Sequence, residues 1–294
     1  MMQTLIRRLT WIDAALLAVL AAFAAYVWIQ IDGRLNYVWR WEIIPAYMFR
    51  FDEAEGRWVA NLFVTGFLTT LRICIYASVL ALIFGVILGL ARTASNLTVN
   101  LLARTWLECL RNVPPVVVVF IFYFFLSEQL ISAFGIEQWA REVAQGDNAR
   151  IWEFFVGDPR LLPALLSGTL VLALFESAFV GEIVRAGLES VDPGQKEAAR
   201  ALGMGSLHEL RFVVLPQAMR KALPPMANQF ITLVKDSSIV SLISVQELTY
   251  RTVELVSSTR AVFEAWLTTA AFYFVLCFGL SLLFRRLEFL GRDQ

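Results

Sequence analysis

Histidine is nearly absent from this sequence, which contains only His208. One imidazole cannot build the metal sites or acid–base pairs that depend on several histidines. Cysteine is also scarce: Cys74, Cys109 and Cys277 are far apart, show no Cys-x-x-Cys spacing and are odd in number. We therefore expect the cysteines to be small core residues, and we predict no disulfide, no metal site and no cofactor.

Charge is low and balanced. Only 17% of the 294 residues are charged, with 25 Lys and Arg against 25 Asp and Glu, whereas a soluble domain carries about 25%. The zero net charge gives no argument for binding nucleic acid. By contrast, 58% of the residues are hydrophobic and the mean hydropathy is +0.64. A single soluble core cannot bury that much apolar sequence, which indicates a membrane protein.

Six apolar stretches are long enough to cross a hydrocarbon core, which requires about 20 helical residues. We therefore predict an all-α membrane protein with six transmembrane helices. The first stretch follows Arg7 and Arg8, as in a signal peptide, but it ends in the bulky residues 26–29, which favours a retained anchor. The six stretches are residues 12–31, 66–91, 113–134, 161–183, 222–245 and 263–284.

The distribution of Lys and Arg predicts the orientation. With the N-terminus inside, segments 1–11, 92–112, 182–221 and 285–294 carry 14 Lys and Arg residues, and the outer loops carry 9. We therefore expect both termini in the cytoplasm. We expect one membrane domain, with residues 32–60 as an outward elaboration. The outer loops contain tryptophans that suit the headgroup level or short interfacial helices, namely Trp39, Trp41, Trp58, Trp139 and Trp152.

The long inner loop, residues 190–216, is expected to form two short helices. Asp192-Pro193-Gly194 is typical of a turn, residues 195–202 favour a helix, and Gly203 is expected to end it. Ser206 and Glu209 have the spacing of a capping box for a second helix, and Pro216 is expected to close that helix.

The first helix of this loop has a face of small residues, Ala198, Ala199 and Ala201. Small side chains allow another backbone to approach closely, so this face suits docking into a groove on a partner. An ordinary loop that rests on its own helical bundle fits the same residues. The physical pattern alone leaves both interpretations open.

Several motifs of this region resemble those of a known family. Glu197-Ala198-Ala199, Gly203 and Leu215-Pro216 are similar to the EAA loop in membrane subunits of type I ABC importers. The resemblance covers about residues 60–290 and is closest to the polar amino acid branch of that family. It continues through residues 178–187, Pro193-Gly194-Gln195, Leu223-Pro224-Pro225, residues 235–238 and Glu108 to Pro115.

The resemblance implies a type I ABC importer transmembrane domain over residues 61–290, preceded by an anchor and periplasmic loop over 1–60 that the five-helix core of the family lacks. It implies a multi-pass protein of the bacterial inner membrane whose loop 190–216 is a coupling helix for a separate ATPase. The implied partners are ATP-binding cassette ATPase subunits, a periplasmic solute-binding protein and a second permease subunit, identical or not. The implied coupling residues are Gly194, Gln195, Glu197, Ala198, Ala199, Gly203, Leu215 and Pro216.

ATP hydrolysis is not expected in this chain, because it contains no Gly-x-x-x-x-Gly-Lys-Ser/Thr phosphate-binding loop. We therefore expect a transport subunit and not an enzyme. The alternative is a self-sufficient secondary carrier or channel, but no inverted repeat marks this sequence. An intramembrane enzyme would need a catalytic histidine arrangement, and His208 lies outside the apolar stretches.

Ionisable groups inside the apolar stretches are candidates for a substrate pathway, since a charge at the bilayer centre costs about 3 kcal/mol. Asn228, Thr232 and Asp236 recur at helical spacing and, with Lys235 and Ser238, form a polar stripe in the fifth stretch. This stripe suits a zwitterion such as an amino acid, and a structural hydrogen-bonded seam fits it equally well.

Glu176, deep in the fourth stretch, is the second pathway candidate. Glu182 and Arg185 have the spacing of a local ion pair. Arg72 is expected to anchor the outer interface, with pairing to Glu176 as the alternative. Arg111 is expected to anchor the chain on the cytoplasmic side.

Overall fold

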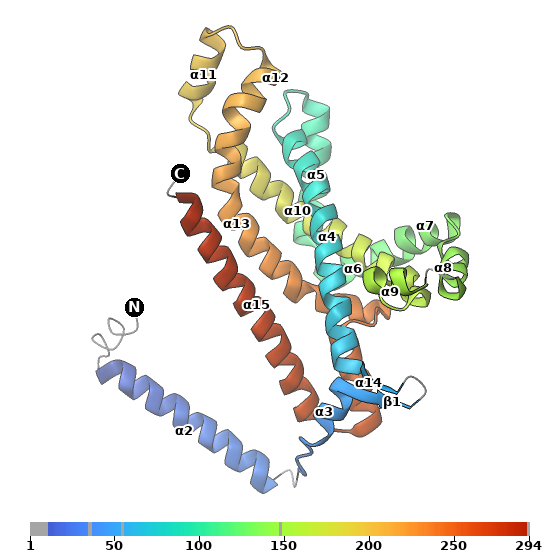
Figure 1. The fold of residues 1–294 in the computed structure, drawn as a ribbon. Coiled ribbons are helices and arrows are strands. Elements are labelled where there is room, and N and C mark those ends of the chain that lie inside the picture. Colours follow the sequence, from blue (N-terminus) through green and yellow to red (C-terminus); the bar gives the residue numbers. More distant parts are fainter. Residues whose placement is uncertain (1–10, 35–36, 54–55, 147–148, 293–294) are drawn as a thin grey trace. The chain divides into compact units, whose positions relative to one another are not determined.

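The computed structural model of the protein describes residues 11–34, 37–53, 56–146 and 149–292 (Figure 1). The chain divides into two compact units, residues 1–41 and 42–294. The structure groups residues 42–60 with the larger unit. The separate role that we expect for residues 1–60 stays a prediction.

The smaller unit contains α2 (Trp11–Arg34), whose side chains from Trp11 to Ile29 are almost all exposed. After the helix, Trp39 stacks on Trp28 at 5.8 Å and on Trp41 at 5.9 Å between ring centroids. Arg7 and Arg8 lie outside the described residues.

Among the described residues, five helical segments are long and apolar enough to cross a membrane: 11–30, 62–92, 115–133, 159–189 and 262–286. They confirm five of the six predicted stretches. The predicted stretch 222–245 is α13 (Leu215–Asp236) followed by the 3-10 helix η4 (Ser237–Ile243). α13 is more polar than the spanning segments because Arg220, Lys221, Lys235 and Asp236 lie within it.

Two long helices form the centre of the larger unit. α4 (Leu62–Arg92) packs along α10 (Leu162–Glu189), and small residues let their backbones approach. A Cβ atom added at Gly85 would lie 2.3 Å from Cγ1 of Val180. α13 then packs on α10, and α15 (Val262–Arg292) packs on α13. The main apolar core includes Ile73, Leu172 and Leu233.

Shorter elements surround this core. α5 (Leu97–Asn112) leads to the third apolar segment, which consists of α6 (Pro115–Phe122), the π-helix η1 (Tyr123–Ser127) and α7 (Glu128–Ala133). α8 (Ile136–Gln145) and α9 (Ala149–Val156) follow, with Trp139 in edge contact with Trp152 at 5.0 Å, and the 3-10 helix η2 (Pro159–Leu161) precedes α10. Cys74 is buried and Cys277 half-buried, but Cys109 is exposed on α5, so the expectation of a core position was wrong for Cys109.

The end of the bundle where α4 and α15 begin carries α3 (Ile43–Met48), a β-hairpin and α14 (Leu248–Thr259). The hairpin pairs β1 (Phe49–Asp52) with β2 (Arg57–Ala60) in antiparallel register and is the sole β-sheet that the described residues show. Ile44, Phe63, Leu248, Leu255 and Ala265 pack together beneath these elements.

Candidate functional site

The first helix of the loop 190–216 is α11 (Pro193–Ala201). It begins two residues before the predicted start at Gln195, so Pro193 and Gly194, predicted as part of a turn, are its first residues. Asp192 caps it: its Oδ1 accepts a hydrogen bond from the Gly194 amide at 2.7 Å. Gly203 ends it with φ of +76°, where the Gly203 amide donates to the Arg200 carbonyl and the Met204 amide to the Ala199 carbonyl. This is a Schellman motif, which favours glycine because the backbone is left-handed.

The second half of the loop differs from the sequence prediction. Ser206 does not cap a helix: Gly205 precedes α12 (Ser206–His208), and no side chain caps it. The helix also does not close at Pro216, because the π-helix η3 (Glu209–Val214) runs directly into α13. Pro216 lies in the first turn of α13, directly after the wider turns of η3, and these make room for a proline ring that donates no backbone hydrogen bond.

Glu209 has a different partner from the one predicted. Its carboxylate accepts a 2.8 Å hydrogen bond from Nε of Arg200, which joins α11 to η3 across the turn. The guanidinium of Arg200 lowers the pKa of the Glu209 carboxyl below its ordinary value, since it stabilises the charged form. The two helices therefore form a linked elbow (residues 193–216), which we call the coupling elbow after the role predicted for it from the sequence.

The outer surface of the coupling elbow is open. Glu197 and Ala198 are exposed, whereas Ala199 is buried within the elbow and is unavailable to a partner. Large apolar side chains are also uncovered: Leu202 is 82% exposed and Leu207 73% exposed. Of the other residues predicted to couple to a partner, Gly194, Gln195, Gly203 and Pro216 are exposed, and Leu215 is partly buried. His208 is exposed and stacks on Phe212, consistent with a loop residue.

The polar stripe of the fifth stretch is only partly inside the protein. Asn228 and Lys235 are exposed on α13. The hydroxyl of Thr232 donates to the Asn228 carbonyl on its own helix, and that of Ser238 donates to the Lys235 carbonyl. These four residues do not converge on a single buried point.

A different set converges on Glu176. This side chain is fully buried on α10, and its Oε2 accepts a 2.6 Å hydrogen bond from Nε2 of Gln229 on α13. Its other oxygen has no hydrogen-bond donor among the described residues. The Glu176 carboxyl also interacts electrostatically with Asp236. The structure thus brings together Glu176 and Asp236, two of the predicted pathway candidates. It adds Gln229, which the sequence analysis did not identify.

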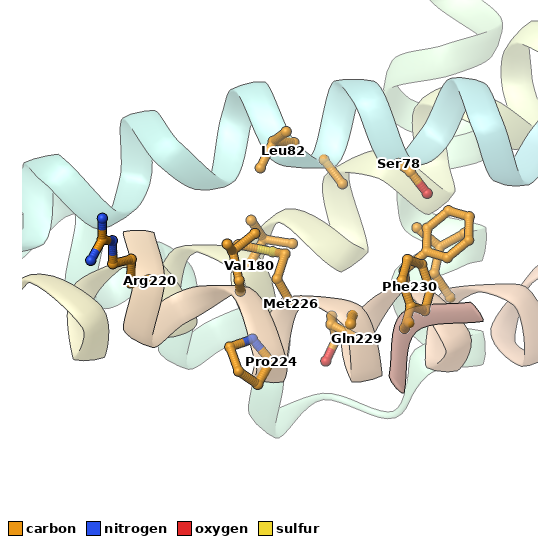
Figure 2. A pocket seen from close by; sticks show the side chains of 13 residues that line it. Ser78, Leu82, Val180, Arg220, Pro224, Met226, Gln229 and Phe230 are labelled. Carbon is orange, nitrogen blue, oxygen red and sulfur yellow. The ribbon is translucent and has the colours of Figure 1, made fainter. Parts of the chain in front are cut away.

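Gln229 lies at the wall of two cavities. The larger one, of about 680 Å³, lies between α4, α10, α13 and the end of α15 (Figure 2). Figure 2 shows Ser78 and Leu82 on α4 across from Met226 and Phe230 on α13. The smaller cavity, of about 330 Å³, is lined by charged groups that include Arg111, Glu182 and Lys221. A polar solute in either cavity would meet the amide that contacts Glu176.

Arg72 does not pair with Glu176. Its Nη2 donates to the carbonyls of Glu153 and Phe154, both at 3.2 Å, and the Tyr76 hydroxyl donates to the Phe155 carbonyl at 2.7 Å. These carbonyls end α9, where the helix dipole favours a cation. The anchoring interpretation of Arg72 fits this arrangement.

The predicted ion pair between Glu182 and Arg185 is present. Arg185 Nε donates to Glu182 at 3.1 Å and also pairs with Glu189, and Arg111 lies 3.8 Å from Glu182. Charges near the C-terminal end of α10 are thus compensated within the chain.

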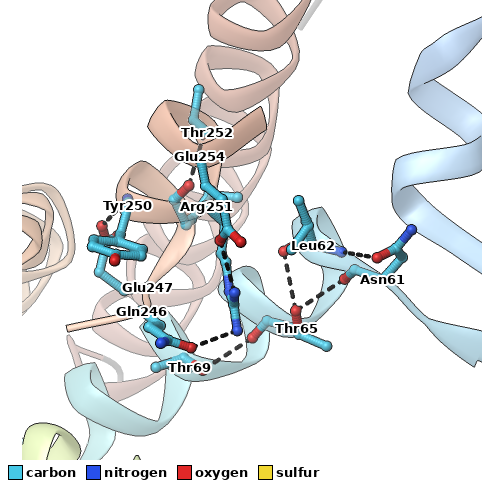
Figure 3. Close-up of polar contacts among 11 residues, drawn as sticks. Asn61, Leu62, Thr65, Thr69, Gln246, Glu247, Tyr250, Arg251, Thr252 and Glu254 are labelled. Atoms are coloured by element: carbon cyan, nitrogen blue, oxygen red, sulfur yellow. Dashed lines mark hydrogen bonds and ion pairs between the residues drawn. The ribbon is translucent and has the colours of Figure 1, made fainter. Parts of the chain in front are cut away.

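The sequence analysis also did not identify Glu247, a second buried acid. Glu247 caps α14, accepting from the Tyr250 amide at 2.8 Å and from the Tyr273 hydroxyl at 2.9 Å. Thr70 on α4 donates to the same carboxylate at 3.3 Å. Figure 3 shows Glu247 beside Arg251, whose guanidinium binds Gln246 and Glu254. A lone acid directly after an apolar stretch was the available signal for this cap, which joins α4, α14 and α15.

Comparison with known proteins shows which family has this architecture. Residues 81–290 match the family described as binding-protein-dependent transport system inner membrane component. The chain is 32% identical over 226 residues to the probable glutamine ABC transporter permease protein GlnM of Bacillus subtilis, covering 76% of this chain and 89% of GlnM. It is 31% identical over 225 residues to the octopine transport system permease protein OccM of Rhizobium radiobacter, covering 76% and 84%.

Solved structures agree. A crystal structure of an amino acid ABC transporter with histidines matches with a TM-score of 0.62 and 32% identity, covering 77% of this chain and 92% of that one. An inward-facing MetNI methionine ABC transporter has the same fold, with a TM-score of 0.58 at 16% identity over 77% of this chain and 94% of that one. This chain therefore belongs to the family of binding-protein-dependent transport system inner membrane components, alongside amino acid ABC transporter permeases.

Proposed function

We propose that the chain is the permease subunit of an ATP-driven importer that moves a polar amino acid, or a similar solute, across the bacterial inner membrane. The observation that carries the proposal is the exposed coupling elbow, which presents Glu197 and Ala198 and ends at Gly203. Its partners are two ATP-binding cassette ATPase subunits, a periplasmic solute-binding protein and a second permease subunit. ATP is hydrolysed by the ATPases and not by this chain.

Coupling is mechanical in this proposal. The ATPases hold the elbow from the cytoplasm, and their closure moves residues 193–216 as a unit because Arg200 and Glu209 link its two helices. The movement passes to α10 and α13, since Leu188 and Val191 pack against Val214 and Ala218 at the base of the elbow. Both termini are cytoplasmic, and residues 1–60 add an anchor and a periplasmic loop to the core of residues 61–290.

The pathway for the solute passes Glu176, Gln229 and Asp236. Two carboxyl groups beside an amide, next to a cavity, suit the ammonium group of an amino acid, which would supply the missing donor to Glu176. Asn228, Thr232, Lys235 and Ser238 stay candidates for the entry or exit of this path, because part of this set is exposed on α13. The relatives act on glutamine and octopine by name, and we assign no single amino acid.

The test is uptake by proteoliposomes that contain the whole complex. We expect Glu197→Ala and Gly203→Val to abolish ATP-dependent uptake, the second because valine is strained at a φ of +76°. Arg141→Ala is the control, since Arg141 is exposed on α8 far from the elbow in sequence. Wild-type uptake and ATPase assembly in both elbow variants would contradict the proposal, and uptake by this chain alone without ATP would favour a secondary carrier.

A further inference from the structure

The hairpin between α3 and α4 has two unlike faces. Opposed residues in an antiparallel pair share a face, so the pairing of Phe51 with Trp58 and of Phe49 with Ala60 gathers three aromatic side chains on one side. Phe49 is 50% exposed, Phe51 53% and Trp58 68%. The Phe51 and Trp58 rings meet edge to face at 5.8 Å. The opposite face holds Arg50, Asp52 and Arg57 together with one apolar residue, Val59.

The level of this hairpin is fixed by Asn61. The Asn61 amide donates to the Met48 carbonyl at 2.9 Å, and its side-chain amide donates to the Ala46 carbonyl at 2.8 Å. Its Oδ1 accepts from the Leu62 amide at 2.9 Å, which caps α4 (Figure 3). The hairpin therefore ends one residue before the apolar helix begins. It therefore lies at the end of a spanning helix, where we place the boundary between the hydrocarbon of the bilayer and water.

The direction of the hairpin agrees with this level. Figure 1 shows β1 extending sideways from the end of α4 and not along the axis of that helix. An element that projects sideways at the end of a spanning helix lies along the membrane surface. Aromatic rings are favoured at the headgroup level, and arginines are favoured near lipid phosphates and water.

We propose that β1 and β2 form an interfacial anchor whose aromatic face, made of Phe49, Phe51 and Trp58, inserts among the lipid headgroups of the outer leaflet. The anchor fixes the depth of α4 in the bilayer through Asn61. The assignment to the outer leaflet rests on the orientation given under Proposed function, whereas insertion into lipid requires only that α4 spans the membrane.

Two variants of the protein, each with a single spin label, test the proposal. The full-length chain is prepared with Cys109 and Cys277 replaced by serine and Cys74 by alanine, and it is placed in phosphatidylcholine and phosphatidylglycerol vesicles. Single cysteines are introduced as Phe51→Cys and, on the opposite face, Asp52→Cys. We expect the label at position 51 to collide with oxygen severalfold more, relative to a water-soluble nickel complex, than the label at position 52.

Other outcomes would overturn the proposal. Equal access of the nickel complex to both labels would place the aromatic face in water. Exclusion of both reagents from position 51 would mean that protein, either α2 or another chain, covers that face. If the substituted background does not fold, quenching of the native protein by brominated lipids is compared with Trp58→Phe; an unchanged quenched fraction would place Trp58 outside the lipid. None of these readings depends on uptake, so failure of the import proposal is distinguishable.

Discussion

Gln229 on α13 donates a 2.6 Å hydrogen bond to the fully buried carboxylate of Glu176 on α10. The buried acid also interacts with the Asp236 carboxyl, and the Gln229 amide is a neutral donor that supports it. The contact joins the two helices that extend from the coupling elbow.

Removing this amide is expected to destabilise the fold. Gln229→Leu leaves a buried carboxylate without its donor, which costs about 1–3 kcal/mol in the free energy of unfolding. Unfolding by a denaturing detergent measures the change. Asn228→Leu is the matched control, because Asn228 is exposed and one residue away. Equal losses in both variants would contradict a specific role for Gln229.

The contact between α4 and α10 has no room for a side chain at Gly85. Gly85→Ala places a methyl group 2.3 Å from Val180 Cγ1, and we expect a loss of about 1–3 kcal/mol in the free energy of unfolding. Gly279→Ala on α15 is the control, since no described atom would crowd its Cβ within 4 Å. Adding Val180→Ala to Gly85→Ala is expected to recover part of the loss, and no recovery would count against overpacking as the cause.

The pairing of Arg200 with Glu209 predicts how the elbow responds to pH. The pKa of Glu209 is lowered, so its stabilising contribution is complete above the usual glutamate value of 4.5 and is lost as the pH falls through the lower value in the folded protein. The protection factors of the amides in residues 193–216, corrected for the intrinsic pH dependence of exchange, should therefore fall only in that acidic range. In Glu209→Gln we expect faster exchange already at neutral pH. Arg211→Ala serves as the control, and identical exchange in wild type and Glu209→Gln would rule out the link.

Arg72 is expected to hold α9 against α4. Arg72→Leu removes the donors to the Glu153 and Phe154 carbonyls, so amide exchange in residues 149–156 should increase while that of α10 stays unchanged. Arg72→Lys keeps the charge but not the fork of donors and should be intermediate. A loss of protection around Glu176 instead would revive the pairing that the structure does not contain.

Much of this fold was predictable because it depends on local sequence. Apolar length predicts the spanning segments, as at residues 62–92, and Asp192 and Gly203 mark the start and end of α11 through their own backbone preferences. The rule that a proline ends a helix failed at Pro216. There the π-helix η3 runs directly into α13, and the helix stays continuous.

The sequence by itself therefore determined the membrane class, the apolar segments, the elbow and the family, since each follows from composition or from a motif within one segment. Only the tertiary structure decided which face of α13 meets α10, so that Gln229 and not Asn228 reaches Glu176. It also decided that Glu209 pairs with Arg200 instead of forming a capping box with Ser206. Those partners depend on how helices are rotated against one another. That rotation is set by packing over the whole contact, such as the fit of Gly85 to Val180, and no single segment contains it.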